Sequence, residues 1–356
     1  MPRAPTKFWK PSARSPTSAA DAAMHPDSIH VETRAPIRID VFLVRRLSGV
    51  SRARVQRHIA AGNVLVDGKR VRSSHRLLGG ETITLPPLTA RRLSEVAEAV
   101  DIPVVYEDDD IVVVNKPAGL VVHPVGGEYR RTVIGALHRR AAARGEDADA
   151  IGIVHRLDRL TSGLMVLSKR YAARRVMAEA VESRQVHRAY IAIVLGVPAA
   201  RSGRVDHFLR RDPARPTRMQ ALDAAAAAEI IRQGWAPHVS ASGYSDPRRN
   251  LRPRRARTHW RVLRRLRGAT VLRCRLETGR THQIRVHMLA IGLPLLGDPL
   301  YGVPSAIDRP ALHASVLGFV HPATGKALRL HAPLPDDLRD LIALHNVLDA
   351  TGSKPI

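Results

Sequence analysis

A single carboxylate, that of Asp158, lies in a short polar segment between two apolar runs. The runs cover residues 151–154 and 164–167, and their composition predicts two short buried strands. Loops that follow strands commonly carry active-site residues, and Asp158 lies in such a loop. Arg156 and Arg159 flank it, and their charge keeps a carboxylate ionised even when it is partly buried. Such a group can act as a nucleophile, although the same pattern also fits a structural ion pair that holds the loop.

The segment around Asp158 is one of four sequence blocks that resemble the RluA-type family of RNA pseudouridine synthases. It reads HRLDRLTSG over residues 155–163, and the family's catalytic aspartate stands at the position of Asp158. The other blocks follow in the family's order: YEDDDIVVVNKPAGL over residues 106–120, RAYIA over residues 188–192, and TGRTHQIRVH followed by GDPLYG over residues 278–302. The resemblance extends over about residues 100 to 335.

The resemblance implies an α+β fold for residues 100–349. The expected catalytic domain has a mixed, largely antiparallel sheet in two halves with a central catalytic cleft. Local patterns alone support only alternating strands and helices. Among them, apolar residues at helical spacing predict a terminal helix within residues 335–349.

The resemblance also implies a reaction and three catalytic residues. Conversion of uridine to pseudouridine breaks the N-glycosidic bond, rotates the base and forms a carbon–carbon bond, so it requires no cofactor and no metal. Asp158 is expected to attack the target nucleotide, at the base or at the sugar, and Arg285 to pair with its carboxylate. Tyr190 is expected to stack on the extruded uracil and to assist proton transfer at carbon 5. The same blocks supply further expected RNA contacts: Arg156, His155, Thr161, Arg188, Arg280, His282, Gln283 and Lys116.

Residues 37–86 resemble a second unit, the S-four-type RNA-binding domain named after a ribosomal protein, which is a small α/β domain. Asp40 and Ser51 stand where they can cap two helices, and Asp67-Gly68 is typical of a hairpin turn. The basic residues of the second helix are expected to contact RNA: Arg52, Arg54 and Arg57. Taken alone, the same pattern also fits a small helical cap with a solvated basic face.

The chain is strongly basic, with 57 lysines and arginines against 32 acidic residues and a formal net charge of +25. This charge would attract a polyanion such as RNA and release its counterions on binding. Part of the excess can also reflect a general bias of composition towards arginine. The sequence has no Gly-rich phosphate loop, no dinucleotide fingerprint and no pair of cysteines. His282 and His287 are five apart, which does not suit two metal ligands on one helix face. We therefore expect no cofactor and no metal.

Three further segments have a composition of their own. Residues 1–36 are proline-rich and basic and are expected to form a disordered tail, with a transit peptide as the alternative and Met24 as a second candidate start. Residues 87–99 are expected to be a linker. Residues 222–255 are an insertion relative to most of the family, in which residues 224–232 predict a helix and residues 243–255 a mobile loop. The insertion is either a tolerated surface loop or an extension of the RNA surface through Arg248, Arg249, Arg252, Arg254 and Arg255.

The remaining features bear on location and substrate. No apolar run is long enough to span a membrane, and the single cysteine, Cys274, is expected to be a buried structural thiol in an alternating strand. We expect a monomeric, cytoplasmic protein whose partner is RNA. An attached S-four-type domain favours large-subunit ribosomal RNA as the substrate, with tRNA as the alternative. Two other functions stay open: an RNA-binding ribosome-assembly factor without catalysis, and a hydrolase that uses Asp158 to release free uracil.

Overall fold

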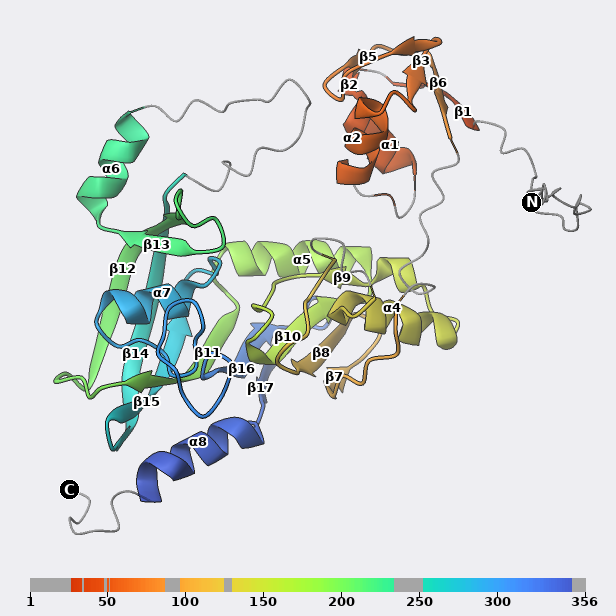
Figure 1. The fold of residues 1–356 in the computed structure, drawn as a ribbon. Coiled ribbons are helices and arrows are strands. Elements are labelled where there is room, and N and C mark those ends of the chain that lie inside the picture. Colours follow the sequence, from red (N-terminus) through yellow and green to blue (C-terminus); the bar gives the residue numbers. More distant parts are fainter. Residues whose placement is uncertain are drawn as a thin grey trace, which may run out of the picture. The chain divides into compact units, whose positions relative to one another are not determined.

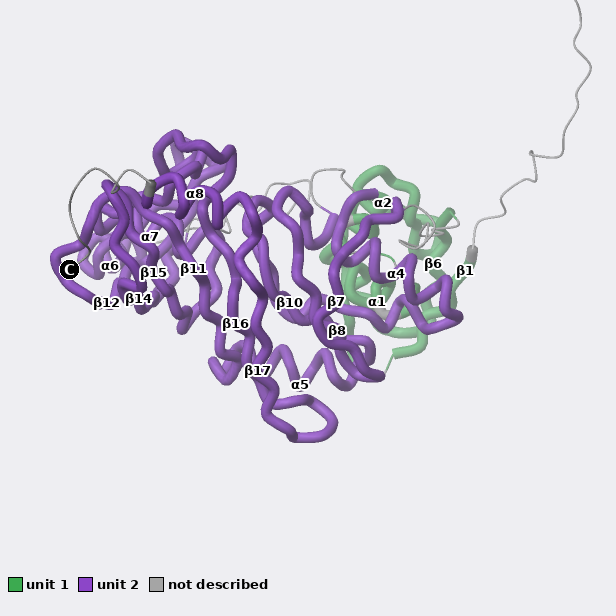
Figure 2. Tube along the Cα trace, turned by 90° about the horizontal axis from the view of Figure 1, so that it is seen from below, with its two compact units in different colours: residues 1–90 green, residues 91–356 purple. Residues whose placement is uncertain are grey.

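The structure is a computed structural model that describes residues 27–33, 35–47, 50, 52–86, 97–124, 130–233 and 252–347. These residues belong to two compact units, Met1–Ala90 and Arg91–Ile356, which Figure 2 shows in different colours. Most of the expected N-terminal tail and most of the expected linker lie outside the described residues. So do residues 234–251 of the expected insertion.

The first unit packs two helices and short antiparallel strands around one core. Its elements are β1 (Asp27–His30), β2 (Ile37–Arg38), α1 (Ile39–Arg46), α2 (Arg52–Ala60), β3 (Leu65–Val66), β4 (Lys69–Arg70), β5 (Arg76–Leu77) and β6 (Thr82–Leu85). The larger sheet has the order β1-β6-β3-β4, and β2 pairs with β5. Leu43 of α1, Val55 of α2 and Ile83 of β6 belong to the same buried cluster. Asp67 and Gly68 have φ values of 46° and 73°, as a two-residue turn of this kind requires, so the expected hairpin is confirmed.

The first unit begins earlier than the sequence pattern suggests. Strand β1 pairs antiparallel with β6, with Ile29 opposite Ile83, and Val31 is 1% exposed. The expectation that the disordered tail extends to residue 36 is therefore wrong for residues 27–31. Residues 27–30 supply a strand to the sheet, and Val31 supplies a side chain to its core.

The second unit contains an 11-stranded mixed sheet and helices that pack against it (Figure 1). Its strands are β7 (Val104–Glu107), β8 (Ile111–Lys116), β9 (Gly152–Ile153), β10 (Ser162–Ser168), β11 (His187–Leu195), β12 (Ser202–Arg211), β13 (Met219–Leu222), β14 (Arg254–Leu266), β15 (Ala269–Leu276), β16 (Leu312–Val320) and β17 (Ala327–His331). Its helices are α4 (Val133–Ala143), a 3-10 turn (Ala148–Ala150), α5 (Tyr171–Glu182), α6 (Ala224–Arg232), α7 (Gln283–Ala290) and α8 (Asp336–Val347).

Several local patterns are confirmed in this unit. Strands β9 and β10 are the two strands expected on either side of Asp158. Helix α8 covers most of the expected terminal helix, and α6 has the bounds expected for the helix of the insertion. Asp223 precedes α6, and its carboxylate caps the helix by accepting a hydrogen bond from the backbone N of Ala226 at 2.7 Å. The loop expected up to Arg255 ends earlier, because β14 begins at Arg254.

A short parallel contact joins the two parts of the sheet. The main path of strands is β13-β12-β14-β15-β11-β16-β10-β8-β7, and every ladder among the described strands is antiparallel except β10–β16. That ladder holds only two residue pairs, one of which is Gly163 opposite Ala314. Gly163 has φ 116°, and a Cβ atom there would lie 2.3 Å from the carbonyl oxygen of Ala314. Only glycine fits this position, so the join between the two halves depends on it.

Ala314 also connects this parallel contact to Tyr190, the candidate catalytic tyrosine. Ala314 pairs with Gly163 of β10 on one side and with Tyr190 of β11 on the other. Five residues before Gly163 stands Asp158. The join therefore fixes the end of the Asp158 loop two strands away from Tyr190.

Alternating side chains let helices cover both faces of the sheet. On β10, Met165 contributes to the cluster that includes α4, whereas Leu164 contributes to the cluster that includes Met177 of α5. Ile284 of α7 belongs to the same cluster as Met165, and this cluster also contains Tyr190. Helices α4 and α7 thus pack on the face that carries Tyr190, and α5 packs on the opposite face of β10.

Lys116 connects the end of β8 to the Asp158 loop. It is 0% exposed, and it lies directly opposite Gly163 in the β8–β10 ladder. Its Nζ donates to the backbone carbonyls of Pro117, Leu120 and Arg159 at 2.8, 2.9 and 3.0 Å. The expectation that Lys116 contacts RNA is therefore wrong, because its ammonium group is enclosed and bonded to the two loops that it holds together.

We predict that Gly163→Ala destabilises the protein far more than Gly268→Ala. Both glycines have positive φ, but a Cβ at Gly268 would meet nothing within 4 Å. Gly268→Ala should therefore cost about 1 kcal/mol, from backbone strain alone. Gly163→Ala adds a clash with a neighbouring strand and should cost more than about 3 kcal/mol. Urea denaturation followed by circular dichroism measures both values, and equal losses would contradict this account of the join.

We predict that Lys116 makes stability depend on pH. Burial lowers its pKa to about 7, with the charge of Asp158 acting in the opposite sense, whereas an unfolded lysine has a pKa of about 10.4. Between about pH 7 and pH 10 the unfolded chain therefore holds a proton that the folded chain has released. This group adds stability as the pH rises through that window and loses it as the pH falls towards 7.

Lys116→Met removes the titrating group, so its free energy of unfolding should rise less between pH 7 and pH 10 than that of the wild type. Urea denaturation at several pH values in this window measures the difference. Lys326→Met, at an exposed position, is the matched control and should follow the wild type. Identical pH dependence in Lys116→Met and the wild type would show that the folded state does not shift this lysine.

Candidate active site

Asp158 lies in the loop between β9 and β10 and lines a cavity of about 70 Å³. Tyr190 on β11 and Arg285 on α7 line the same cavity. The structure thus brings together the three residues expected to be catalytic, although they are far apart in the sequence. The other lining residues are Arg156, Leu157, Thr161, Arg188, Leu276, Gly279, Arg280, Thr281, Gln283, Ile284 and Leu312.

The carboxylate of Asp158 is held near two buried cations. Nη1 of Arg285 lies 3.8 Å from its Oδ2, which is close enough for an ion pair but too far for a hydrogen bond. Lys116 is the second when its amine is protonated, and in that form its charge interacts with that of Asp158. The flanking arginines act differently, since Arg156 is exposed and Arg159 donates from Nε to a backbone carbonyl at 3.1 Å. The buried counter-charges therefore come from elements remote in the sequence.

Arg285 is oriented mainly by Asp298, a residue to which the sequence blocks assigned no role. The two side chains form a bidentate pair, with Nε and Nη2 of Arg285 each 2.6 Å from a carboxylate oxygen of Asp298. Burial acts to lower the pKa of Arg285, but its hydrogen bonds to Asp298 and the charge of Asp158 raise it overall. The guanidinium carbon also lies 4.9 Å from the ring centre of Tyr301. With Arg285 fixed in this way, its Nη1 lies towards Asp158.

Tyr190 forms part of an apolar wall of the cavity. Its side chain is 5% exposed and packs in one cluster with Ile284 and Leu312. Burial raises the pKa of its phenol, although the positive charge of Arg188 opposes the shift. The phenol is therefore protonated at neutral pH. An apolar wall with one aromatic ring suits a flat base, and a protonated phenol can donate a hydrogen bond.

Two buried side chains of the cavity have polar atoms without a partner among the described residues. These atoms are Oγ1 of Thr161 and Nε of Arg188, on side chains of residues that are 2% and 6% exposed. Such atoms carry a desolvation cost that a bound ligand can offset. Arg156 and Arg280 also line the cavity and are exposed. RNA contact by these four residues stays a prediction.

Two residues expected to contact RNA are buried and hydrogen-bonded within the protein. His155 is buried, its Nε2 accepts a hydrogen bond from the backbone N of Val166 at 3.2 Å, and burial lowers its pKa to about 3. Gln283 is 3% exposed, and within the protein its Nε2 donates twice and its Oε1 accepts twice. The expectation for His155 is wrong, because its side chain is enclosed and bonded to the fold. Gln283 lines the Asp158 cavity, so its contact with RNA stays a prediction. His282 is partly buried, and its Nδ1 forms a hydrogen bond with the hydroxyl of Tyr301 at 2.8 Å.

In the first unit, the arginines expected to contact RNA lie on α2. Asp40 does not cap α1 as expected: it lies within the first turn, is 0% exposed and accepts hydrogen bonds from three side chains, including Arg52 Nε at 3.0 Å. Arg52 therefore ties α2 to α1. Arg57 is exposed and Arg54 is partly exposed. RNA contact by the three arginines stays a prediction.

Among the described residues, one group has the composition of a metal site: Asp108, Asp110 and His321. The carboxylate of Asp108 already accepts hydrogen bonds from the Tyr106 hydroxyl, two backbone N–H groups and Nε2 of His321. Burial acts to raise the pKa of Asp108, but these bonds hold it at about 2. We therefore interpret the group as a structural network in which the carboxylate of Asp108 already accepts several hydrogen bonds. The expected absence of a metal stays a prediction.

Two further expectations concern Cys274 and membrane spans. Cys274 is 0% exposed and burial raises its pKa to about 12, which confirms a buried thiol. Within the described ranges, none of the helices combines the length and apolar character that crossing a membrane requires.

Comparison with known proteins agrees with this geometry. The sequence model of the family described as RNA pseudouridylate synthase matches residues 110–290, and that of the S4 domain matches residues 37–83. The chain is 37% identical to the ribosomal large subunit pseudouridine synthase D of Nitrosomonas europaea, over 97% of this chain and 96% of that protein. It is also 37% identical to an uncharacterized RNA pseudouridine synthase of Bacillus subtilis, over 86% of this chain and 93% of that protein.

A solved structure has a similar fold. The human RNA pseudouridylate synthase domain containing 4 aligns with a TM-score of 0.52 and 25% identity, covering 68% of this chain and 92% of that one. The mixed sheet and the sequence matches lead to one conclusion: the chain belongs to the RluA-type family of RNA pseudouridine synthases and carries an S4 domain in its N-terminal part.

Proposed function

We propose that this enzyme converts specific uridines of large-subunit ribosomal RNA to pseudouridine, with Asp158 as the nucleophile. The observation that carries the proposal is the single cavity that Asp158, Tyr190 and Arg285 line together. The name of the relative from Nitrosomonas europaea supports ribosomal RNA as the substrate class. The S4 domain is compatible with it, and tRNA is the alternative substrate.

The reaction requires Asp158 to reach a nucleotide that has left its helix. The cavity of about 70 Å³ is smaller than ordinary ligand pockets of roughly 300–1,000 Å³, so the exposed side chains of Arg156 and Arg280 must move to admit uracil. Arg156 is placed to fill the gap that the extruded nucleotide leaves or to bind a phosphate. The apolar wall around Tyr190 returns part of the stacking lost on extrusion, on the order of 1–3 kcal/mol.

Asp158 then attacks the nucleotide, at the base or at the sugar, and the bond between N1 and C1′ breaks. The uracil rotates, carbon 5 bonds to C1′, and the proton of carbon 5 is lost while N1 gains one. An aspartate is already ionised at neutral pH, so the protein has to orient it rather than activate it. Arg285 provides this orientation, since Asp298 fixes its guanidinium and leaves Nη1 beside Asp158.

Tyr190 is the residue best placed to handle the proton of carbon 5. Because burial raises the pKa of its phenol, Tyr190 starts protonated and can accept that proton only as it passes its own proton on. The carboxylate of Asp158 lines the same cavity and is a suitable acceptor once it has left the nucleotide.

The substrate class can be tested directly. Carbodiimide-stable adducts should appear in large-subunit ribosomal RNA from cells with the gene and disappear from cells without it. Loss of adducts from tRNA instead would favour the alternative substrate. The monomeric state and the cytoplasmic location stay predictions, and size-exclusion chromatography and cell fractionation test them.

We predict that Asp158→Asn abolishes isomerisation and leaves the fold and the affinity for RNA unchanged. The two side chains are nearly isosteric, but the amide is a poor nucleophile. Tritium release from carbon-5-labelled uridine measures the reaction, and a rate of a tenth of the wild type or more would remove Asp158 from this role.

The wild type should leave the mass of the RNA unchanged, whereas free uracil and abasic sites would indicate a hydrolase. An absence of both products across cellular RNA would favour an assembly factor without catalysis.

We predict that Tyr190→Phe binds RNA as the wild type does but loses about a hundredfold in the chemical step, because it keeps the ring and lacks the hydroxyl. Tyr190→Ala should also lose stacking, worth roughly tenfold to a hundredfold more. Single-turnover rates for both variants, measured with saturating enzyme, separate the two contributions. A Phe variant at half the wild-type rate would show that stacking alone is required.

A further inference from the structure

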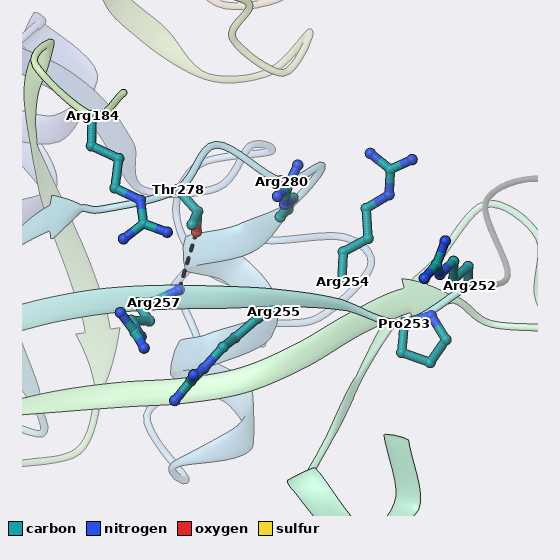
Figure 3. A pocket seen from close by; sticks show the side chains of 8 residues that line it. All are labelled: Arg184, Arg252, Pro253, Arg254, Arg255, Arg257, Thr278 and Arg280. Atoms are coloured by element: carbon teal, nitrogen blue, oxygen red, sulfur yellow. Dashed lines mark hydrogen bonds between the residues drawn. The ribbon is translucent and has the colours of Figure 1, made fainter. Parts of the chain in front are cut away.

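A second cavity lies beside the start of β14 and is lined mainly by arginines (Figure 3). Its volume is about 400 Å³. No acidic side chain lines it among the residues that the structure describes, and besides Pro253 and Thr278 its walls consist of arginines. These are Arg184, Arg252, Arg254, Arg255, Arg257 and Arg280. We call it the β14 arginine cavity.

Two carboxylates neutralise only part of this charge. Asp206 of β12 binds Arg255 through two hydrogen bonds of 2.9 Å and Arg257 through one of 3.0 Å. Glu277 binds Arg257 at 3.2 Å and lies 4.0 Å from Arg184. Six guanidinium groups therefore face two carboxylates. The charge that remains is concentrated in one cavity.

Within the described part of the chain, the side chains of the other three arginines form no ion pair and no hydrogen bond: Arg252, Arg254 and Arg280. Figure 3 shows Arg254 and Arg280 extending to one side of β14, whereas Arg255 and Arg257 extend to the other. The pKa of Arg280 is lowered by burial and by the like charges of Arg254 and Arg184. Mutual repulsion of this kind is relieved when an anion binds.

The chemistry of the lining selects the kind of anion. Guanidinium groups present planar pairs of N–H donors that match phosphate oxygens, and several of them around one cavity can bind more than one phosphate. Consecutive residues of one segment line the arginine cavity and the active site. Thr278 lines the arginine cavity, Gly279 lines the Asp158 cavity, and Arg280 lines both.

We propose that the β14 arginine cavity binds phosphate groups of the RNA chain next to the nucleotide that enters the Asp158 cavity. The proposal rests on the proposed function, since it takes the substrate of the Asp158 site to be RNA. It also assigns a role to the end of the insertion, residues 252–255, which supplies three of the six arginines. Arg280 then acts at the boundary, where the backbone of the extruded nucleotide meets the neighbouring phosphates.

The test compares two double variants of the full-length protein. Arg252→Gln/Arg254→Gln removes two cavity arginines. Arg261→Gln/Arg264→Gln removes the same charge from exposed positions of β14 outside the cavity. All four side chains are exposed, so both variants should unfold at the wild-type temperature.

Filter binding of a uridine-containing RNA stem-loop, repeated at several salt concentrations, is the measurement. Each phosphate contact contributes about 0.7 to 0.9 to the slope of log affinity against log salt, so the cavity variant should lose about 1.4 to 1.8 from the slope. It should also bind about tenfold more weakly or worse at low salt. The control variant should keep a slope close to that of the wild type. Equal slopes in the two double variants would overturn the proposal.

Two further measurements separate the possible sources of phosphate and the two proposals. Titration with inorganic phosphate at constant ionic strength tests whether the cavity binds a free anion. If the cavity variant loses the phosphate binding of the wild type but keeps its RNA affinity, the assignment to RNA is overturned. Pseudouridine formation is measured on the same RNA. A changed slope without pseudouridine would support the cavity as an RNA phosphate site and count against the proposed function alone. Pseudouridine formation with an unchanged slope would support the proposed function and count against the cavity as an RNA phosphate site.

Discussion

The close approach of two strands, β10 and β16, is the constraint on which the rest of the catalytic unit depends. The strands run parallel for only two residue pairs, and the backbone of Ala314 leaves no room for a side chain at Gly163. Antiparallel ladders on each side of this contact build the two halves of the sheet. Since Asp158 stands just before β10 and Tyr190 pairs with Ala314, the contact also sets the spacing between Asp158 and the ring of Tyr190.

Buried charges around the Asp158 cavity are fixed by hydrogen-bond acceptors within the protein. Three backbone carbonyls hold the ammonium group of Lys116, and Asp298 holds the guanidinium of Arg285. A buried cation without such partners would be costly, so both side chains are fully engaged before any substrate binds. They can therefore orient Asp158 without rearranging. The exposed arginines at the cavity are free of this constraint and are suited to contacts that form and break with each RNA.

Sequence patterns identified the residues of the candidate active site well, but they predicted poorly what several of those side chains contact. The block around Asp158, the strands that flank it, the hairpin at Asp67-Gly68 and helix α6 follow from local composition and spacing. His155 and Lys116 stand in the same blocks and were expected to contact RNA, yet both are enclosed and bonded to the fold. A polar residue in a functional block can serve the substrate or the scaffold, and local sequence does not distinguish the two.

The sequence by itself determined which family the catalytic blocks resemble, where the chain turns, and that the protein suits a polyanion. Those properties depend on residue type and short-range spacing, which the sequence displays directly. Tertiary structure decided that Lys116 is an internal clamp, that Asp298 orients Arg285, that β1 belongs to the first unit, and that arginines from three segments surround one cavity. Each of these depends on contacts between residues distant in the chain, and no local pattern encodes which strands and loops will meet.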